Sequence, residues 1–172
     1  MKLYLARHTS VGVPKGICYG QTDVPLNASF ETEAEMLRKQ LENIHADAVF
    51  SSPLTRCTRL ASFCGFPDVK TDMRLKELHF GDWEMEIWDD LDMRIWVDDW
   101  VNIPAPNGES FRQLYERVVS FIEEQIQIGK ENVLVFTHGG VINCARVYFG
   151  LTDWKGAFDQ LPQYGELFEF QT

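Results

Sequence analysis

The chain has 172 residues, of which 45% are hydrophobic, and it carries a formal net charge of −10 at pH 7. This length suits one domain with a full hydrophobic core, and the composition is that of an ordered globular protein. The acidic balance disfavours nucleic acid and anionic membranes as partners, because both require a basic surface.

Nothing in the sequence indicates secretion or membrane insertion. No apolar stretch approaches the roughly 20 residues of a membrane-spanning helix. The first residues contain one lysine and no secretory apolar segment. Four cysteines, Cys18, Cys57, Cys64 and Cys144, have no paired spacing, so we expect free thiols and a cytoplasmic protein.

The first predicted element is a short buried strand that ends in two functional residues. Leu3 and Leu5 are apolar, Tyr4 favours β structure, and Arg7 and His8 follow directly. In open α/β sheets, ligands bind beyond the carboxyl ends of the strands. The Arg-His pair is therefore expected to face a ligand and not the core.

Residues 11–26 form a long loop rich in glycine and proline. Loops of this length in compact domains are usually functional, so Tyr19, Gln21 and Asp23 are candidates for substrate contact. The alternative is that Asp23 caps a turn and Tyr19 packs in the interior. Apolar residues at helical spacing then predict one amphipathic helix over residues 30–44.

A second strand is predicted over residues 48–52, and a helix over residues 53–64. Ser52-Pro53 is typical of a helix start, which places Arg56 one turn into the helix. The alternative for Arg56 is a surface salt bridge. The alternation of strand and helix indicates parallel strands joined by right-handed crossovers.

Residues 83–103 are acidic and rich in tryptophan, and we expect them to form a short helical insertion of one or two helices. A break at residues 104–108 separates this insertion from a long helix predicted over residues 111–126.

A third apolar strand, residues 132–137, ends in His138 and Gly139 and precedes a helix; residues 164–170 alternate as an edge strand. Three strands thus bring Arg7, His8, Arg56 and His138 to one edge of the sheet. Guanidiniums and imidazoles beside helix starts supply the donors and positive charge that a phosphate needs. Zinc is the alternative ligand, but adjacent guanidiniums would repel a dication.

Four short motifs occur in the order and spacing of one enzyme family: Arg7-His8, Ser52-Pro53-x-x-Arg56, Leu75-x-Glu77-x-x-x-Gly81-x-Trp83-Glu84 and Thr137-His138-Gly139. Together they resemble the histidine phosphatase superfamily, also called phosphoglycerate mutase-like, from residue 1 to about residue 150. The Arg-His-Thr form and the pattern of residues 16–26 more narrowly resemble the alpha-ribazole phosphatases of cobalamin assembly. The resemblance implies a three-layer α/β/α fold with a mostly parallel sheet.

The resemblance also implies a role for each site residue. His8 is the nucleophile that forms a phosphohistidine, and Glu77 gives a proton to the leaving group and later takes one from water. Arg7, Arg56 and a protonated His138 would bind the phosphate and lower the pKa of His8. Possible substrate contacts are Thr9, Tyr19, Gln21 and Gly139. No cofactor and no metal is implied.

The implied activity is that of a metal-independent phosphomonoesterase acting on a small phosphate ester, alpha-ribazole 5′-phosphate. Trp83, Trp88 or Tyr19 is a candidate to stack on its benzimidazole, although such aromatics are more often core residues. The alternatives are a phosphoglycerate mutase, a broad-specificity sugar-phosphate phosphatase and a non-catalytic module that binds a phosphate ligand. The sequence leaves the oligomeric state open.

Overall fold

One five-stranded sheet forms the centre of the molecule, in the strand order β3-β2-β4-β1-β5. The computed structural model describes the backbone of residues 1–172 and every side chain except that of Ile95. Neighbouring strands are parallel except for β1 and β5, which are antiparallel. The strands are β1 (Lys2–Arg7), β2 (Ala48–Ser51), β3 (Lys70–Thr71), β4 (Asn132–Thr137) and β5 (Leu167–Gln171).

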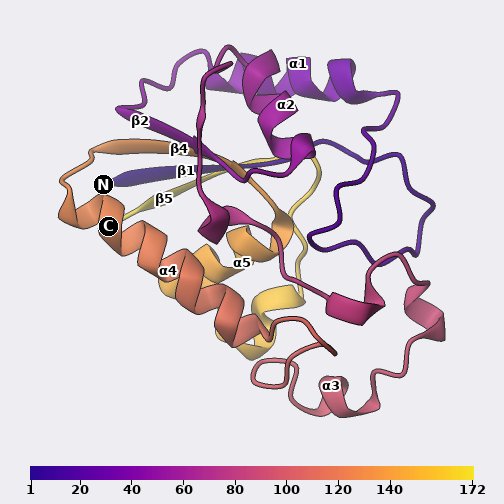
Figure 1. Cartoon of the computed structure of the whole chain (residues 1–172). Coiled ribbons are helices and arrows are strands. Elements are labelled where there is room, and N and C mark those ends of the chain that lie inside the picture. Colours follow the sequence, from indigo (N-terminus) through magenta and orange to yellow (C-terminus); the bar gives the residue numbers. More distant parts are fainter.

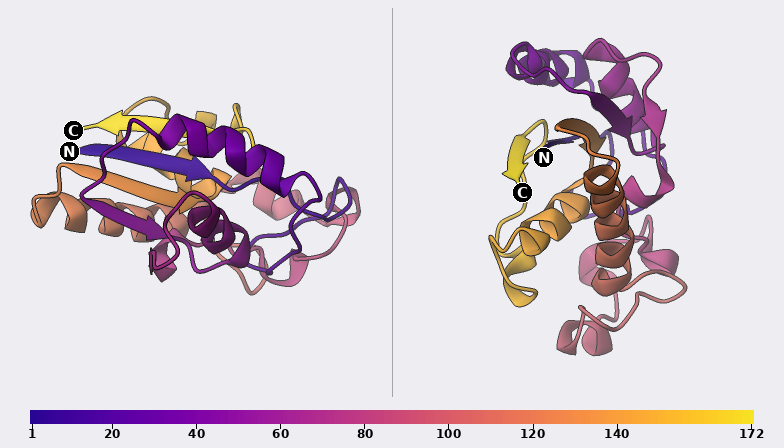
Figure 2. Two further views of the ribbon diagram at one scale, coloured as in Figure 1. Left: turned by 90° about the horizontal axis from the view of Figure 1, so that it is seen from above. Right: turned by 90° about the vertical axis from the view of Figure 1, so that its left-hand side faces the viewer.

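Helices cover both faces of the sheet and make the three predicted layers (Figure 1, Figure 2). Helices α1 (Phe30–Leu41) and α2 (Thr55–Phe63) lie on one face, and α4 (Phe111–Gln127) and α5 (Gly139–Tyr148) lie on the other. The predicted α/β fold with a mostly parallel sheet is therefore confirmed.

The alternation of side chains along the central strands explains why both faces are covered. On β4, Leu134 and Phe136 pack with α1 and α2, whereas Val133 and Val135 pack with α4 and α5. Successive side chains of a strand point to opposite faces, so a strand with a continuous apolar run, such as residues 133–136, needs cover on both. This burial fixes the carboxyl ends of β1, β2 and β4 side by side.

The helices begin and end close to the predicted positions. Helix α2 begins at Thr55, after the extended residue Leu54, and α1 ends at Leu41, earlier than predicted. Helix α4 begins with a capping box, in which Ser110 and Gln113 each accept a backbone N–H of the other. No helix in the described part of the chain has both the length and the apolar character needed to cross a membrane.

Residues 83–103 contain one short helix where one or two were expected, and most of the segment is irregular. Apart from the five-residue helix α3 (Arg94–Asp98), they form turns, the end of the 3₁₀ turn Gly81–Trp83 and the 3₁₀ turn Trp88–Asp90. Trp83 is buried in a cluster with Cys18 and Ala105, against which other aromatic side chains of the segment pack. Aspartates favour turns over helix interiors, and Trp83 is buried against Cys18 of the loop of residues 11–26 from outside any α-helix.

Candidate active site

His8 follows β1 directly, and its ring is buried with 2% of the residue exposed. Its Nδ1 donates to the carbonyl oxygen of Thr9 at 2.7 Å. Because a carbonyl oxygen can only accept, this bond places the proton on Nδ1 and leaves a lone pair on Nε2. His8 therefore presents a nitrogen that can attack an electrophile.

The environment of His8 keeps its imidazole neutral. Burial lowers the pKa of His8 well below its ordinary value, and the positive charges of Arg56 and Arg7 lower it further. The hydrogen bond to Thr9 acts in the opposite direction but does not outweigh them. A neutral imidazole is the form required of a nucleophile.

His138 lies at the start of α5, with its ring centre 5.2 Å from that of His8. Arg56 Nε donates to His138 Nδ1 at 3.3 Å, and His138 Nε2 is hydrogen-bonded to the hydroxyl of Ser52 at 2.8 Å. Burial, followed by the charge of Arg56, lowers the pKa of His138 well below its ordinary value. Without a bound anion, His138 is therefore neutral, contrary to the expected protonated form. The positive charge of the site comes from Arg7 and Arg56.

Arg56 is completely buried beside the two histidines. Besides His138, its guanidinium donates to the carbonyl oxygens of Thr22 at 2.9 Å and of Gly20 at 2.6 Å. A guanidinium has five N–H donors, so it can hold an oxyanion in addition to these three bonds. Arg56 thus ties the loop of residues 11–26 to the site.

Arg7 faces the site from the end of β1, across from the segment that leads into β5. Its guanidinium donates to the carbonyl oxygen of Pro162 and lies 4.1 Å from the ring centre of Tyr164. Tyr164 also packs beside His8, with the ring centres 5.6 Å apart. The backbone of residues 162–166 therefore holds the Arg-His pair in place.

The carboxyl group of Glu77 is held by backbone amides. Its Oε1 accepts from Leu78 N at 2.8 Å, and its Oε2 accepts from Gly140 N at 3.1 Å. Gly140 is in the first turn of α5, where backbone N–H groups favour a negative partner. Each carboxyl oxygen can still exchange a proton or accept a second bond.

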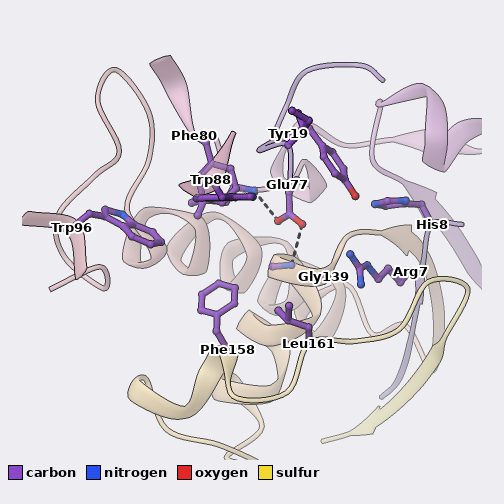
Figure 3. Close-up of a pocket in the computed structure, with 13 residues that line it drawn as sticks. Arg7, His8, Tyr19, Glu77, Phe80, Trp88, Trp96, Gly139, Phe158 and Leu161 are labelled. Carbon is purple, nitrogen blue, oxygen red and sulfur yellow. Dashed lines mark hydrogen bonds between the residues drawn. The ribbon is translucent and has the colours of Figure 1, made fainter. Parts of the chain in front are cut away.

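A cavity of about 310 Å³ is lined by Arg7, His8 and Glu77 (Figure 3). One end presents Arg7, His8, Glu77, Gly139 and Gly140. The rest of its wall is apolar or aromatic, formed by Ile17, Tyr19, Leu78, Phe80, Trp88, Trp96, Phe158 and Leu161. The cavity therefore offers a charged reaction centre beside a largely uncharged chamber.

The predicted substrate contacts divide into two groups. Tyr19 and Gly139 line the cavity, whereas Thr9 is fully buried and Gln21 donates to the backbone oxygen of Glu77 at 3.0 Å. Asp23 does not line the cavity and does not cap a local turn; it accepts from the backbone and the hydroxyl of Thr55 at the start of α2.

Of the two tryptophans proposed to stack on a substrate, Trp88 lines the cavity and Trp83 is part of the core. Arg56 and His138 are fully buried, hydrogen-bonded to each other, and are not among the residues that line the cavity.

Sequence reasoning missed Ser52 as a partner of His138, and it missed Tyr164. The hydroxyls of Tyr19 and Tyr164 are hydrogen-bonded to each other, although the residues are 145 positions apart. Tyr19 also borders a second cavity of about 410 Å³, which Tyr164 lines from the other side. No local pattern marks Tyr164, because its partners come from the opposite end of the chain.

The described residues contain no group of three or more His, Cys, Asp or Glu side chains arranged to hold a metal ion. The charged groups nearest to the imidazoles are guanidiniums, which attract anions. The geometry is therefore that of an oxyanion site.

Comparison with known proteins agrees with this geometry. The profile of the histidine phosphatase superfamily (branch 1) matches residues 3–163. The chain belongs to this superfamily. The adenosylcobalamin/alpha-ribazole phosphatase of Escherichia coli K12 is 32% identical to this histidine phosphatase over 155 residues, which cover 83% of the chain and 76% of the relative.

Two solved structures show the same fold as this histidine phosphatase. The alpha-ribazole phosphatase of Shigella flexneri superposes with a TM-score of 0.84 at 25% identity, covering 99% of the chain and 90% of the neighbour. A phosphoglycerate mutase of Thermus thermophilus superposes with a TM-score of 0.79 at 32% identity, covering 98% and 92%. Their names describe both phosphatases and mutases.

Alanine at residue 140 should impair activity more than alanine at residue 139. A Cβ on Gly140 would overlap Glu77 Oε1 and lie 3.1 Å from Leu114 Cδ2, whereas a Cβ on Gly139 would lie 3.5 Å from the Arg7 guanidinium, an ordinary contact. Displacement of a reacting group by about 1 Å costs up to about 100-fold in rate. We expect Gly140→Ala to lower kcat at least about tenfold relative to Gly139→Ala; equal losses would contradict the role given to Gly140.

The stability of the protein should fall as the pH drops below about 6.5, the ordinary pKa of histidine. Because the folded pKa of His8 is lowered, the unfolded chain binds a proton that folded His8 does not, and this favours unfolding by up to about 1.4 kcal/mol per pH unit. Urea unfolding of wild type and His8→Gln at pH values from about 7.5 to 5.5 gives the free energy of unfolding as a function of pH. The non-titrating variant should lose less stability over that interval; parallel curves would refute the lowered pKa.

Proposed function

We propose that this histidine phosphatase is a metal-independent phosphomonoesterase that forms a phosphohistidine at His8 and acts on alpha-ribazole 5′-phosphate. The observation that carries the proposal is the bond from His8 Nδ1 to Thr9, which directs an unprotonated Nε2 toward a cavity that also contains Arg7 and Glu77. A neutral nucleophile, a cation and a carboxyl group are the components that phosphoryl transfer to histidine requires.

In the first half-reaction, the lone pair of His8 Nε2 attacks phosphorus and the bond from phosphorus to the ester oxygen breaks. Arg7 and Arg56 neutralise charge on the non-bridging oxygens. A phosphate dianion beside His138 favours the protonated form of its ring, which can then donate a hydrogen bond to these oxygens. Protonated Glu77 gives its proton to the ester oxygen, and the alcohol leaves.

In the second half-reaction, Glu77 takes a proton from a water molecule, whose oxygen attacks the phosphorus of the phosphohistidine. The bond between phosphorus and nitrogen breaks, its electron pair returns to His8 Nε2, and inorganic phosphate leaves. His8 is neutral again and Glu77 is protonated for the next cycle. The hydrogen bond to Thr9 holds the Nδ1 proton throughout.

The charges around His8 support a reaction without a metal ion. Arg56 contacts His138, and both Arg56 and Arg7 lie close enough to His8 to lower its pKa. Guanidiniums so close to His8 would repel a divalent cation at that position and can themselves bind a phosphate. The chemistry of these groups favours a substrate that is a phosphate monoester.

The apolar chamber supports a leaving group with a flat, uncharged aromatic part. Trp88, Phe80 and Phe158 line it, and among the described residues of the wall Arg7 is the one cationic side chain. A carboxylate such as that of 3-phosphoglycerate would have to enter this chamber without a second cation. Trp88 and Tyr19 offer faces on which a benzimidazole can stack.

A phosphohistidine should be detectable on His8 during turnover. Rapid mixing with a phosphate ester, followed by an alkaline quench and intact-mass or peptide analysis, should show one added phosphoryl group on the peptide of residue 8. His8→Ala should lack the adduct and lose at least about 1,000-fold in kcat. EDTA should leave the wild-type rate unchanged; loss of activity that zinc or magnesium restores would contradict the metal-independent reaction.

Among small phosphate esters, alpha-ribazole 5′-phosphate should give the highest kcat/KM. Ribose 5-phosphate is the matched control because it lacks only the base, and 3-phosphoglycerate tests the mutase-like alternative. We expect a preference of about 10- to 100-fold over both, since burial and stacking of the base contribute roughly 1.4–2.8 kcal/mol. Trp88→Ala should lower the rate with alpha-ribazole 5′-phosphate and leave that with ribose 5-phosphate nearly unchanged. Equal rates on all three esters would indicate a broad-specificity phosphatase.

A further inference from the structure

The segment that carries Glu77 belongs to neither a helix nor a strand. It follows the 3₁₀ turn Met73–Leu75, and residues 76–80 have no regular secondary structure. Its backbone carbonyls therefore need partners outside the sheet, since an unpaired buried carbonyl destabilises the fold. The carbonyl of Leu75 accepts from the hydroxyl of Thr137 at 2.9 Å. The position of Glu77 thus depends on side chains from other elements.

Arg117 supplies most of these partners. It projects from α4, and its Nη1 donates to the carbonyl oxygens of Arg74 at 2.7 Å and Lys76 at 2.6 Å. Its Nη2 donates to the carbonyl oxygen of Glu77 itself at 2.8 Å. One guanidinium therefore binds the backbone at Glu77 and at the residues that lead into it.

Glu109 orients this guanidinium. Arg117 Nε donates to Glu109 Oε1 at 2.9 Å and Nη2 donates to Oε2 at 2.9 Å, which is a bidentate pair. The side chains of Arg117 and Glu109 are only 18% and 22% exposed, so solvent screens the pair weakly. Glu109 also accepts from His79 N at 3.0 Å, and its own backbone N donates to the His79 carbonyl at 2.7 Å.

We propose that Arg117 is a positioning residue of the reaction, which places the carboxyl group of Glu77 at the leaving oxygen by holding the backbone of residues 74–77. This inference rests on the proposed function, in which Glu77 is the proton donor. Arg117 contacts only backbone oxygens and Glu109 among the hydrogen bonds of the described residues, so its effect on the substrate passes through Glu77.

The planar guanidinium is specifically suited to this task. Lysine has one ammonium group and cannot direct fixed donors at three carbonyls and a carboxylate at once. Arg117→Lys keeps the positive charge and much of the side-chain volume while removing this geometry. It therefore tests the position of Glu77 with less risk of unfolding than a neutral substitution.

The test compares two esters that differ in their need for a proton donor. An alkyl phosphate has a poor leaving group, whereas 4-nitrophenyl phosphate has a good one and needs little protonation. Arg117→Lys should lower kcat on the alkyl ester about 10- to 100-fold, because misplacing a general acid forfeits much of its contribution. On the aryl ester it should lower kcat less than about threefold, with KM nearly unchanged on both.

The decisive measurement is a double-mutant cycle with Glu77→Gln on the alkyl ester. If Arg117 acts through Glu77, adding Arg117→Lys to Glu77→Gln should not lower kcat on the alkyl ester any further. A merely structural role would lower the rate by the same factor in both backgrounds and on both esters, and this result would overturn the proposal. No loss on the alkyl ester in the wild-type background would overturn it as well.

Arg112→Lys provides a matched control from the same helix. Arg112 donates to Asn102 Oδ1 at 2.7 Å and lies 4.8 Å from the ring centre of Trp154, with no bond to residues 74–79 among the contacts of the described residues. Arg112→Lys should change kcat on the two esters by the same factor. A selective loss on the alkyl ester as large as that of Arg117→Lys would contradict the proposal. Glu77→Gln alone tests the proposed function separately. An equal loss of kcat on both esters would show that Glu77 is not the proton donor, independently of the result for Arg117.

Discussion

The close approach of two guanidiniums to two buried imidazoles is the constraint on which the site depends. Arg56 has no solvent exposure, and an arginine is stable there because backbone carbonyls and His138 accept its N–H groups. The same charges, together with burial, keep His8 and His138 in the neutral form. Binding of an oxyanion and activation of a nucleophile are thus two consequences of one arrangement of charge.

The sheet determines where this charge gathers. Strands β1, β2 and β4 are parallel neighbours, and each is followed at its carboxyl end by a residue of the site. Both faces of these strands are packed against helices, so the ends of the strands are fixed relative to one another. Glu77 is different, because its segment has no strand of its own and takes its position from α4, from the first turn of α5 and from the amide of Gln21.

This difference explains how much could be predicted from the sequence. Arg7, His8 and His138 stand directly after apolar strands, so local pattern and strand order suffice to bring them together. The roles of Ser52, Tyr164 and Arg117 arise from contacts between distant parts of the chain, and single residues of these types carry no local signal. The tryptophan-rich segment holds only the short helix α3, because many of its apolar residues pack as an aromatic cluster beside Cys18.

The hydrogen bond between Tyr19 and Tyr164 has a consequence for the size of molecule that the site can admit. It joins two segments that border the cavities of about 310 Å³ and about 410 Å³, and it is exposed to solvent. A bond of this kind contributes only about 0.5–1.5 kcal/mol, so it restrains the two segments weakly. Ile17, Tyr19 and Trp88 line both cavities, so the two hollows share a wall beside this bond. That shared wall comes from loop and turn residues and not from the sheet, so its shape can change while the strands stay in place.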